Sequence, residues 1–192
     1  MIDQLDHAQK AIKQIKITCE QAAAPLLHVA QKGAQLTHFF DFDISSLRDY
    51  SSEDIRYSKE YQEVFSKLLA IWGPVVYVFE IDSDVDPAQV LAAAKSYSGE
   101  RALPAFRKGT NEVSRVLYVG KVKRNFWGRV IQHLGFYKVP ATQGLQLFHW
   151  GRELNLKLKL TVFEFEPDMV ELLPLLENAV AQVLEPLVGK HK

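Results

Sequence analysis

The chain has 192 residues, of which 47% are hydrophobic and 24% are charged, with a formal net charge of zero, and it is typical of a globular domain with an extension. No apolar run reaches the roughly 20 residues of a membrane-spanning helix, which argues against a membrane partner, and the single cysteine excludes an internal disulfide or a cysteine-rich zinc site. The first residues are polar and acidic, unlike a targeting peptide, so we expect a cytoplasmic protein.

A helix is predicted over residues 2–24, where apolar residues recur at alternating spacings of three and four and form one stripe. The stripe consists of Leu5, Ala8, Ile12, Ile15, Cys19 and Ala22. We expect Pro25 to interrupt this helix and a second short helix to run on to Gly33. The stripe suits packing against another helix, either within the chain or across a homodimer.

The next stretch, residues 39–51, mixes aspartates and a serine pair with aromatic residues and is predicted to be an irregular connection. The four residues 51–54 resemble a capping box at the start of a helix. That helix is marked by a stripe of Tyr61, Phe65, Leu68 and Trp72. Residues 1–72 are therefore expected to form a helical N-terminal extension.

From residue 73 onward the pattern alternates between strands and helices, which predicts a second unit over residues 73–192. Strands are predicted from β-branched, aromatic and alternating residues at 75–81, 113–119 and 156–165. A change of phase at Val162 and Phe163 indicates a bulge in the last strand. Helices are predicted from Pro87 over about ten residues, from an Asn125 cap to Leu134, and from Pro174 to Leu184.

The neutral net charge hides a strong asymmetry along the chain. Residues 1–100 hold 9 lysines and arginines against 15 aspartates and glutamates, whereas residues 101–160 hold 12 against 2. Such a basic segment favours a polyanionic partner, because local charge sets the local potential. Packing of the basic segment against the acidic half of the chain explains the asymmetry equally well.

Five residues whose side chains could take part in catalysis follow one another along these elements: Tyr77, Tyr118, Arg129, His133 and Glu177. Tyr77 ends a Val-Val-Tyr triplet, Tyr118 begins a Tyr-Val-Gly triplet, and the arginine and histidine are one helical turn apart. In this order they resemble the GIY-YIG nuclease family over about residues 73–190. The triplets are 40 residues apart, which requires an insertion at about residues 82–112, like those of restriction-type members, and Gly189 stands where the family often has an asparagine.

The element pattern and this resemblance together predict a mixed α/β (α+β) fold, in which helices flank a small, mainly antiparallel, three-stranded sheet. The resemblance implies metal-dependent hydrolysis of phosphodiester bonds in nucleic acid, with DNA favoured and with Mg²⁺ or Mn²⁺ as cofactor. Tyr77 would be the general base or would orient the attacking water, and Tyr118 would assist it by hydrogen bonding. Arg129 would bind the scissile phosphate, His133 would support it or act as an alternative base, and Glu177 would hold the metal ion.

Elementary chemistry explains why these residue types suit the reaction. A metal ion lowers the pKa of a nearby hydroxyl, a guanidinium offers a planar fork to phosphate oxygens, and a divalent ion needs at least one carboxylate. Each residue also has an ordinary structural explanation. The tyrosines could be core residues of buried strands, Arg129 and His133 a solvated helix face, and Glu177 a glutamate favoured by the helix dipole.

Six further cations could follow a phosphate backbone: Lys121, Lys123, Arg124, Arg152, Lys157 and Lys159. A solvated strand face explains Lys157 and Lys159 equally well. Two alternatives to a nuclease therefore stay open. One is a non-catalytic nucleic-acid-binding module with a degenerate nuclease fold, and the other is a protein-interaction domain whose basic segment meets an acidic partner.

Overall fold

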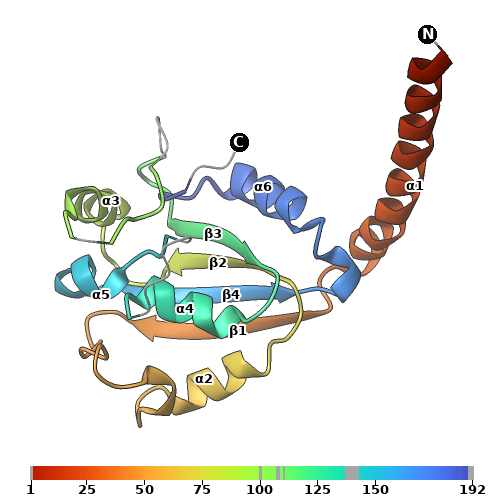
Figure 1. Cartoon of the computed structure of the whole chain (residues 1–192). Coiled ribbons are helices and arrows are strands. Elements are labelled where there is room, and N and C mark those ends of the chain that lie inside the picture. Colours follow the sequence, from red (N-terminus) through yellow and green to blue (C-terminus); the bar gives the residue numbers. More distant parts are fainter. Residues whose placement is uncertain (1, 100, 107–108, 110, 137–142, 190–192) are drawn as a thin grey trace.

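The computed structural model describes residues 2–99, 101–106, 109, 111–136 and 143–189, with side chains from residue 7 onward (Figure 1). Its centre is a four-stranded antiparallel sheet in the order β1-β4-β2-β3. The strands are β1 (Leu36–Asp43), β2 (Val75–Ile81), β3 (Val116–Val122) and β4 (Lys157–Glu164). The mixed α/β class is thus confirmed, whereas the prediction of a three-stranded sheet is wrong.

The additional strand, β1, lies in the stretch that was expected to be an irregular connection. Phe40 and Phe42 are buried and pair in register with Leu160 and Leu158 of β4, while the intervening Asp41 is exposed. Aspartates are disfavoured in strands, so the composition of this stretch conceals its alternation. Only the distant partner strand makes the alternation meaningful, because it supplies the buried face.

The described part of the chain also contains six α-helices (Figure 1). They are α1 (Ile2–Lys32), α2 (Gln62–Leu69), α3 (Pro87–Ser96), α4 (Phe126–Leu134), α5 (Leu147–Trp150) and α6 (Leu173–Leu184). Much of α1 projects away from the body of the molecule (Figure 1). Among the described helices, none combines the length and the hydrophobicity that a bilayer crossing requires.

The expected break at Pro25 does not occur, and α1 is continuous through it. A proline fits the helical φ angle, and its main cost is one missing backbone hydrogen bond. The residues that follow, Leu26 and Val29, pack against buried residues on one face of the sheet. This packing holds the last turns of α1 in line and outweighs the effect of the proline.

The sheet is covered on both faces. On one face a large cluster includes Tyr77 and Phe79 of β2, Phe65 of α2, and Phe126 and Val130 of α4. On the other face α6 and the end of α1 cover a smaller cluster that includes Val78 and Ala181. Residues 36–72 contribute β1 and α2 to the first cluster, so that part of the expected helical extension belongs to the same core as residues 73–188.

The last strand contains no bulge at Val162 and Phe163, since both its pairings run in continuous register. Its alternation fades there because Val162 lies in the first cluster while Phe163 packs against the second, so both faces are covered. The register shift of the sheet instead separates Phe79 from Glu80 in the pairing of β2 with β3.

Most other predicted elements are present, with local differences. The helix α3 begins at Pro87 as expected, with Asp86 as its cap, whereas Asp54 caps a short 3₁₀ turn, Ile55–Tyr57, ahead of α2. Trp72 lies beyond α2 and is 80% exposed. Asn125 precedes α4 in a left-handed conformation, and its side chain makes no capping hydrogen bond. The predicted 113–119 strand begins only at Val116.

Candidate active site

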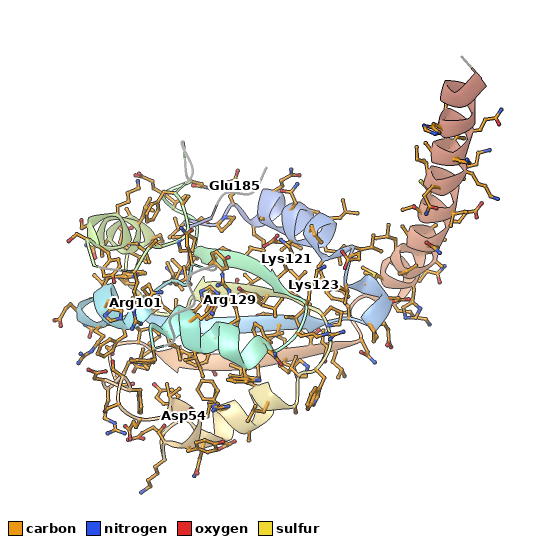
Figure 2. The ribbon with its side chains drawn as sticks, viewed as in Figure 1. Asp54, Arg101, Lys121, Lys123, Arg129 and Glu185 are labelled. Atoms are coloured by element: carbon orange, nitrogen blue, oxygen red, sulfur yellow. The ribbon has the colours of Figure 1, made fainter. Side chains whose placement is uncertain are left out.

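Four of the predicted residues meet on the face of the sheet that α4 covers. Tyr77 and Tyr118 come from the neighbouring strands β2 and β3, and their ring centroids are 6.0 Å apart. Arg129 and His133 project toward them from successive turns of α4. Figure 2 shows Arg129 over the sheet, with Lys121 and Lys123 further along on the side of α6.

His133 is a fully buried neutral ring with a defined tautomer. Its Nδ1 accepts a hydrogen bond from the backbone N–H of Leu145 at 3.1 Å, so the neutral ring carries its proton on Nε2. Nε2–H therefore donates to the hydroxyl oxygen of Tyr77 at 2.8 Å. Burial, together with the nearby charge of Arg129, holds the pKa of His133 well below its usual range, and the ring stays neutral at pH 7.

Tyr77 is completely enclosed. Its oxygen accepts hydrogen bonds from His133 and from Nε of Arg129, the latter at 3.2 Å. Burial raises the pKa of Tyr77 well above its ordinary value, although the charge and hydrogen bond of Arg129 oppose the shift. At rest, Tyr77 is thus a neutral phenol whose oxygen fixes two neighbouring side chains.

The close packing around Gly120 explains why the second triplet ends in glycine. It pairs with Tyr77 across the sheet, and a Cβ atom at this position would lie 2.5 Å from the tyrosine oxygen and 2.6 Å from Cε1 of Tyr118. A side chain here would displace both phenol rings. The glycine is therefore required by the close approach of the two tyrosines.

Arg129 spans the two tyrosines with its guanidinium. Besides the bond to Tyr77, its Nη2 lies 3.4 Å from the oxygen of Tyr118, and its Nη1 donates to Oε1 of Gln132 at 2.9 Å. Burial disfavours the charge, but the two tyrosine oxygens outweigh it and raise the pKa of Arg129. Gln132 was not singled out by the sequence, since a glutamine between an arginine and a histidine carries no specific signal.

A cavity of about 570 Å³, which we name the basic cavity, opens beside this network. Of the described residues, those with polar side chains that line it are Tyr118, Lys121, Arg124, Asn125, Trp127, Arg129, Gln132 and Glu177. Tyr118 is 8% exposed and reaches the cavity, whereas Tyr77 and His133 lie behind it. The first turn of α4 also faces the cavity, and a helix N-terminus favours an anion.

Glu177 of α6 faces the network from the other side of the basic cavity. Its side chain is 14% exposed and forms an ion pair with Lys121 of β3. It is the one carboxylate that lines the cavity within the described part of the chain, where no group of three or more metal-ligating side chains occurs. One carboxylate in an open cavity suits Mg²⁺, which keeps several waters and binds substrate phosphates.

The six predicted backbone-binding cations fall into three pairs. Lys121 and Arg124 line the basic cavity. Lys123 instead pairs with Glu171 at 2.7 Å, and the guanidinium of Arg152 lies 5.0 Å from the ring centroid of Phe148. The third pair, Lys157 and Lys159, lies on β4.

Lys157 and Lys159 lie on the opposite face of the sheet from Tyr77 and Tyr118. They alternate along β4 with Leu158 and Leu160, which belong to the same cluster as Tyr77. The register sets Lys159 opposite Asp41 on one side and Glu80 on the other. Both lysines are exposed on a solvated strand face and are not among the described residues that line the basic cavity, and their contact with nucleic acid stays a prediction.

Gly189 lies in the segment after α6, which runs alongside β3. The backbone N–H groups of Leu187 and Val188 donate to Val116 and Leu117. Gly189 itself has a φ angle of +117°, a conformation that side chains rarely adopt. An asparagine at this position would be strained, so the local backbone accounts for the glycine.

Comparison of the chain with protein-family models, with curated proteins and with solved structures found no match.

Proposed function

We propose that this protein is a metal-dependent endonuclease that hydrolyses phosphodiester bonds in nucleic acid, with DNA as the favoured substrate. The observation that carries the proposal is the convergence of Tyr77, Tyr118, Arg129 and His133, from three separate elements, into one hydrogen-bonded network. Glu177 lies across the adjoining basic cavity. These are the side chains whose order along the chain resembles that of the GIY-YIG family.

The geometry favours Tyr118, rather than Tyr77, as the residue that meets the attacking water. Tyr118 lines the basic cavity, whereas Tyr77 is enclosed behind it. As a phenolate, Tyr118 would take one proton of the water as the water oxygen bonds to phosphorus. The bond from phosphorus to the leaving oxygen then breaks, and the leaving oxygen takes a proton from a solvent water. The guanidinium of Arg129, 3.4 Å from its oxygen, would stabilise that phenolate.

The other residues hold the substrate and the geometry. Tyr77 and His133 fix Arg129, which would bind an oxygen of the scissile phosphate, and Lys121 and Arg124 would bind flanking phosphates. A Mg²⁺ or Mn²⁺ ion held by Glu177 would supply charge stabilisation at the phosphate and lower the pKa of nearby hydroxyls. Cytoplasmic localisation and a homodimer that cuts both strands belong to this proposal as well.

One observation favours the second candidate, a nucleic-acid-binding module without catalysis. Lys121 forms an ion pair with Glu177, so the carboxylate proposed as the metal ligand has a cation of the chain beside it. A degenerate site, in which a lysine replaces the metal ion permanently, would have this arrangement.

The test is incubation of the purified protein with plasmid, branched DNA and RNA, with and without Mg²⁺ or Mn²⁺. We expect metal-dependent cleavage, and a decrease of about 100-fold or more in Glu177→Gln, which keeps the shape of the side chain but removes its charge. Glu171→Gln is the matched control, because Glu171 is an exposed carboxylate paired with Lys123 outside the cavity. Binding without cleavage of any substrate would favour the non-catalytic module.

A further inference from the structure

A second cavity, of about 470 Å³, lies on the other side of Trp127 from the basic cavity. We name it the aromatic cavity. It is bounded by residues 50–56, which connect β1 to α2, and by Trp127, Ile131 and Phe136 at and beyond α4. Trp127 lines both cavities, which makes them neighbours. In Figure 2, Asp54 of this region and Lys121 of the basic cavity lie on opposite sides of α4.

Two planar groups that contact each other, those of Arg56 and Trp127, line the aromatic cavity. The guanidinium carbon of Arg56 lies 4.5 Å from the ring centroid of Trp127 and 5.4 Å from that of Tyr57. The charge of Arg56 is already paired, because its Nε donates to Asp54 at 2.9 Å. With its charge compensated, the planar group serves for stacking rather than for holding a phosphate.

The remaining walls of the aromatic cavity are also suited to a flat, uncharged ring. Ile55 and Ile131 are buried, and the rings of Tyr50 and Phe136 lie edge to face with their centroids 5.3 Å apart. Serine hydroxyls and carboxylates form the rim, where they could accept or donate hydrogen bonds at the edge of a heterocycle.

The two neighbouring cavities differ in charge. The described side chains that line the basic cavity include the cations Lys121, Arg124 and Arg129 against one carboxylate, Glu177. Those of the aromatic cavity include two carboxylates, Glu53 and Asp54, which are paired with Arg48 and Arg56 respectively. A phosphate is therefore favoured in the first cavity, where cations outnumber the carboxylate, and not in the second, where the charges are paired, which leaves the second to the uncharged part of a nucleotide.

We propose that the aromatic cavity binds an unpaired nucleobase next to the phosphate that occupies the basic cavity. This inference rests on the proposed function and names its substrate class, which is nucleic acid with an unpaired nucleotide at the cleavage site. A base within a duplex has both faces covered by its neighbours and must leave the stack to contact a protein ring. Trp127 and Arg56 provide the replacement stack.

The test is equilibrium binding in EDTA, so that affinity is measured without cleavage. Three labelled duplexes are compared: one fully paired, one with a single bulged nucleotide, and one with the same bulge lacking its base. Wild-type protein should bind the bulged base about 5- to 100-fold more tightly than the abasic bulge, the ratio that stacking one base on an aromatic side chain provides. The abasic duplex keeps every phosphate and thus isolates the base.

Variants locate the effect. Trp127→Ala should abolish the preference for the bulged base, and Trp127→Phe, which keeps a ring, should retain most of it. Arg56→Lys keeps the charge but loses the plane, so it should reduce the preference without the risk of a cavity beside the core. Trp72→Ala is the control, because Trp72 is an exposed tryptophan that is not among the described residues lining either cavity.

Equal wild-type affinities for the bulged and abasic duplexes would overturn the inference, as would a preference that survives both Trp127→Ala and Arg56→Lys. The inference and the proposed function fail separately. Metal-dependent cleavage without any preference for the base would leave the nuclease proposal standing and overturn this one. A preference for the base in EDTA with no cleavage of any substrate would do the reverse.

Discussion

Cations of the same basic segment, residues 101–160, lie on both faces of the sheet, but in different environments. On one face Arg129 is partly buried and has three hydrogen-bond partners, the oxygens of Tyr77, Tyr118 and Gln132. On the other face Lys159 is exposed in the middle of a strand, and the register sets it between Asp41 and Glu80. The described cations of residues 101–160 therefore do not form one continuous surface.

The difference matters because the environment determines what a charge can do. An exposed ion pair is solvated and screened, and contributes about 1 kcal/mol or less. A guanidinium held in a partly dehydrated site beside a cavity keeps a stronger field and needs no reorganisation when an anion arrives. We therefore expect function to depend on Arg129 and its supports, and to be largely insensitive to the lysines of β4.

The largest effect should come from Arg129 itself. Arg129→Ala removes the planar fork at the scissile phosphate and should lower the single-turnover cleavage rate by about 1,000-fold, a value typical of arginines that stabilise phosphoryl transfer. Arg129→Lys should recover only part of the rate, because an ammonium cannot span two tyrosine oxygens. Lys159→Ala is the control, and a loss of similar size in that variant would break the contrast between the two faces.

The next effect concerns the close approach of the two tyrosines over Gly120. Gly120→Ala places a methyl group within 3 Å of both rings and should destabilise the fold by about 1–3 kcal/mol, as overpacking does in cores. Gly128→Ala, in α4, adds a Cβ atom that has no neighbouring atom within 4 Å. Because alanine favours a helix more than glycine does, this change should stabilise the fold by about 0.5–1 kcal/mol. Urea denaturation measures the free energy of unfolding of both variants. Equal values for Gly120→Ala and Gly128→Ala would show that the tyrosines can move apart.

Four of the five residues that the sequence singled out lie together in the structure, whereas one strand of the sheet was not predicted. The sequence pointed to these residues because each has a distinctive side chain on a strongly patterned element, such as the buried strand Val75–Ile81. β1 was missed because its pattern acquires meaning only from β4, which lies more than 100 residues further along the chain. No local signal could supply that pairing.

The placement of cations was also beyond the sequence. Strict alternation at Leu156–Phe165 predicted that one set of side chains faces solvent, but alternation alone does not say which face adjoins the tyrosines. Lys157 and Lys159 consequently were assigned to the site, whereas Lys121, also listed as a backbone-binding residue, proved to be the partner of Glu177. Roles depend on these contacts, which arise only when distant elements pack together.

A third prediction uses pH to test the buried network. His133 stays neutral when folded but gains a proton when unfolded below pH 6.5, so stability should fall with decreasing pH by up to about 1.4 kcal/mol per unit. Tyr77 keeps its proton when folded but loses it when unfolded above pH 10.0, so stability should also fall with rising alkalinity. Both contributions are fully present between these two values.

Urea denaturation across a pH series measures these slopes. His133→Gln should flatten the acid limb and Tyr77→Phe the alkaline limb, whereas His7→Gln, which alters an exposed residue of α1, should leave both unchanged. An acid limb of wild-type slope in His133→Gln would mean that other groups govern acid unfolding and that the ring is not held neutral by burial.

The smallest effect, and the one that sharpens the comparison most, concerns the salt dependence of DNA binding. Each phosphate contact contributes about −0.9 to the slope of log affinity against log salt on duplex DNA. Because Lys121 and Arg124 line the basic cavity, Lys121→Gln and Arg124→Gln should each lower the magnitude of that slope by about one. Lys157→Gln and Lys159→Gln remove the same charge from the same segment, yet they should leave the slope unchanged, because neither lysine is among the described residues that line the cavity. The register places Lys159 opposite Glu80, at the other end of β2 from Val76, which is the partner of Lys121. If all four variants changed the slope equally, DNA would have to contact both ends of the sheet, and binding would not be centred on the basic cavity.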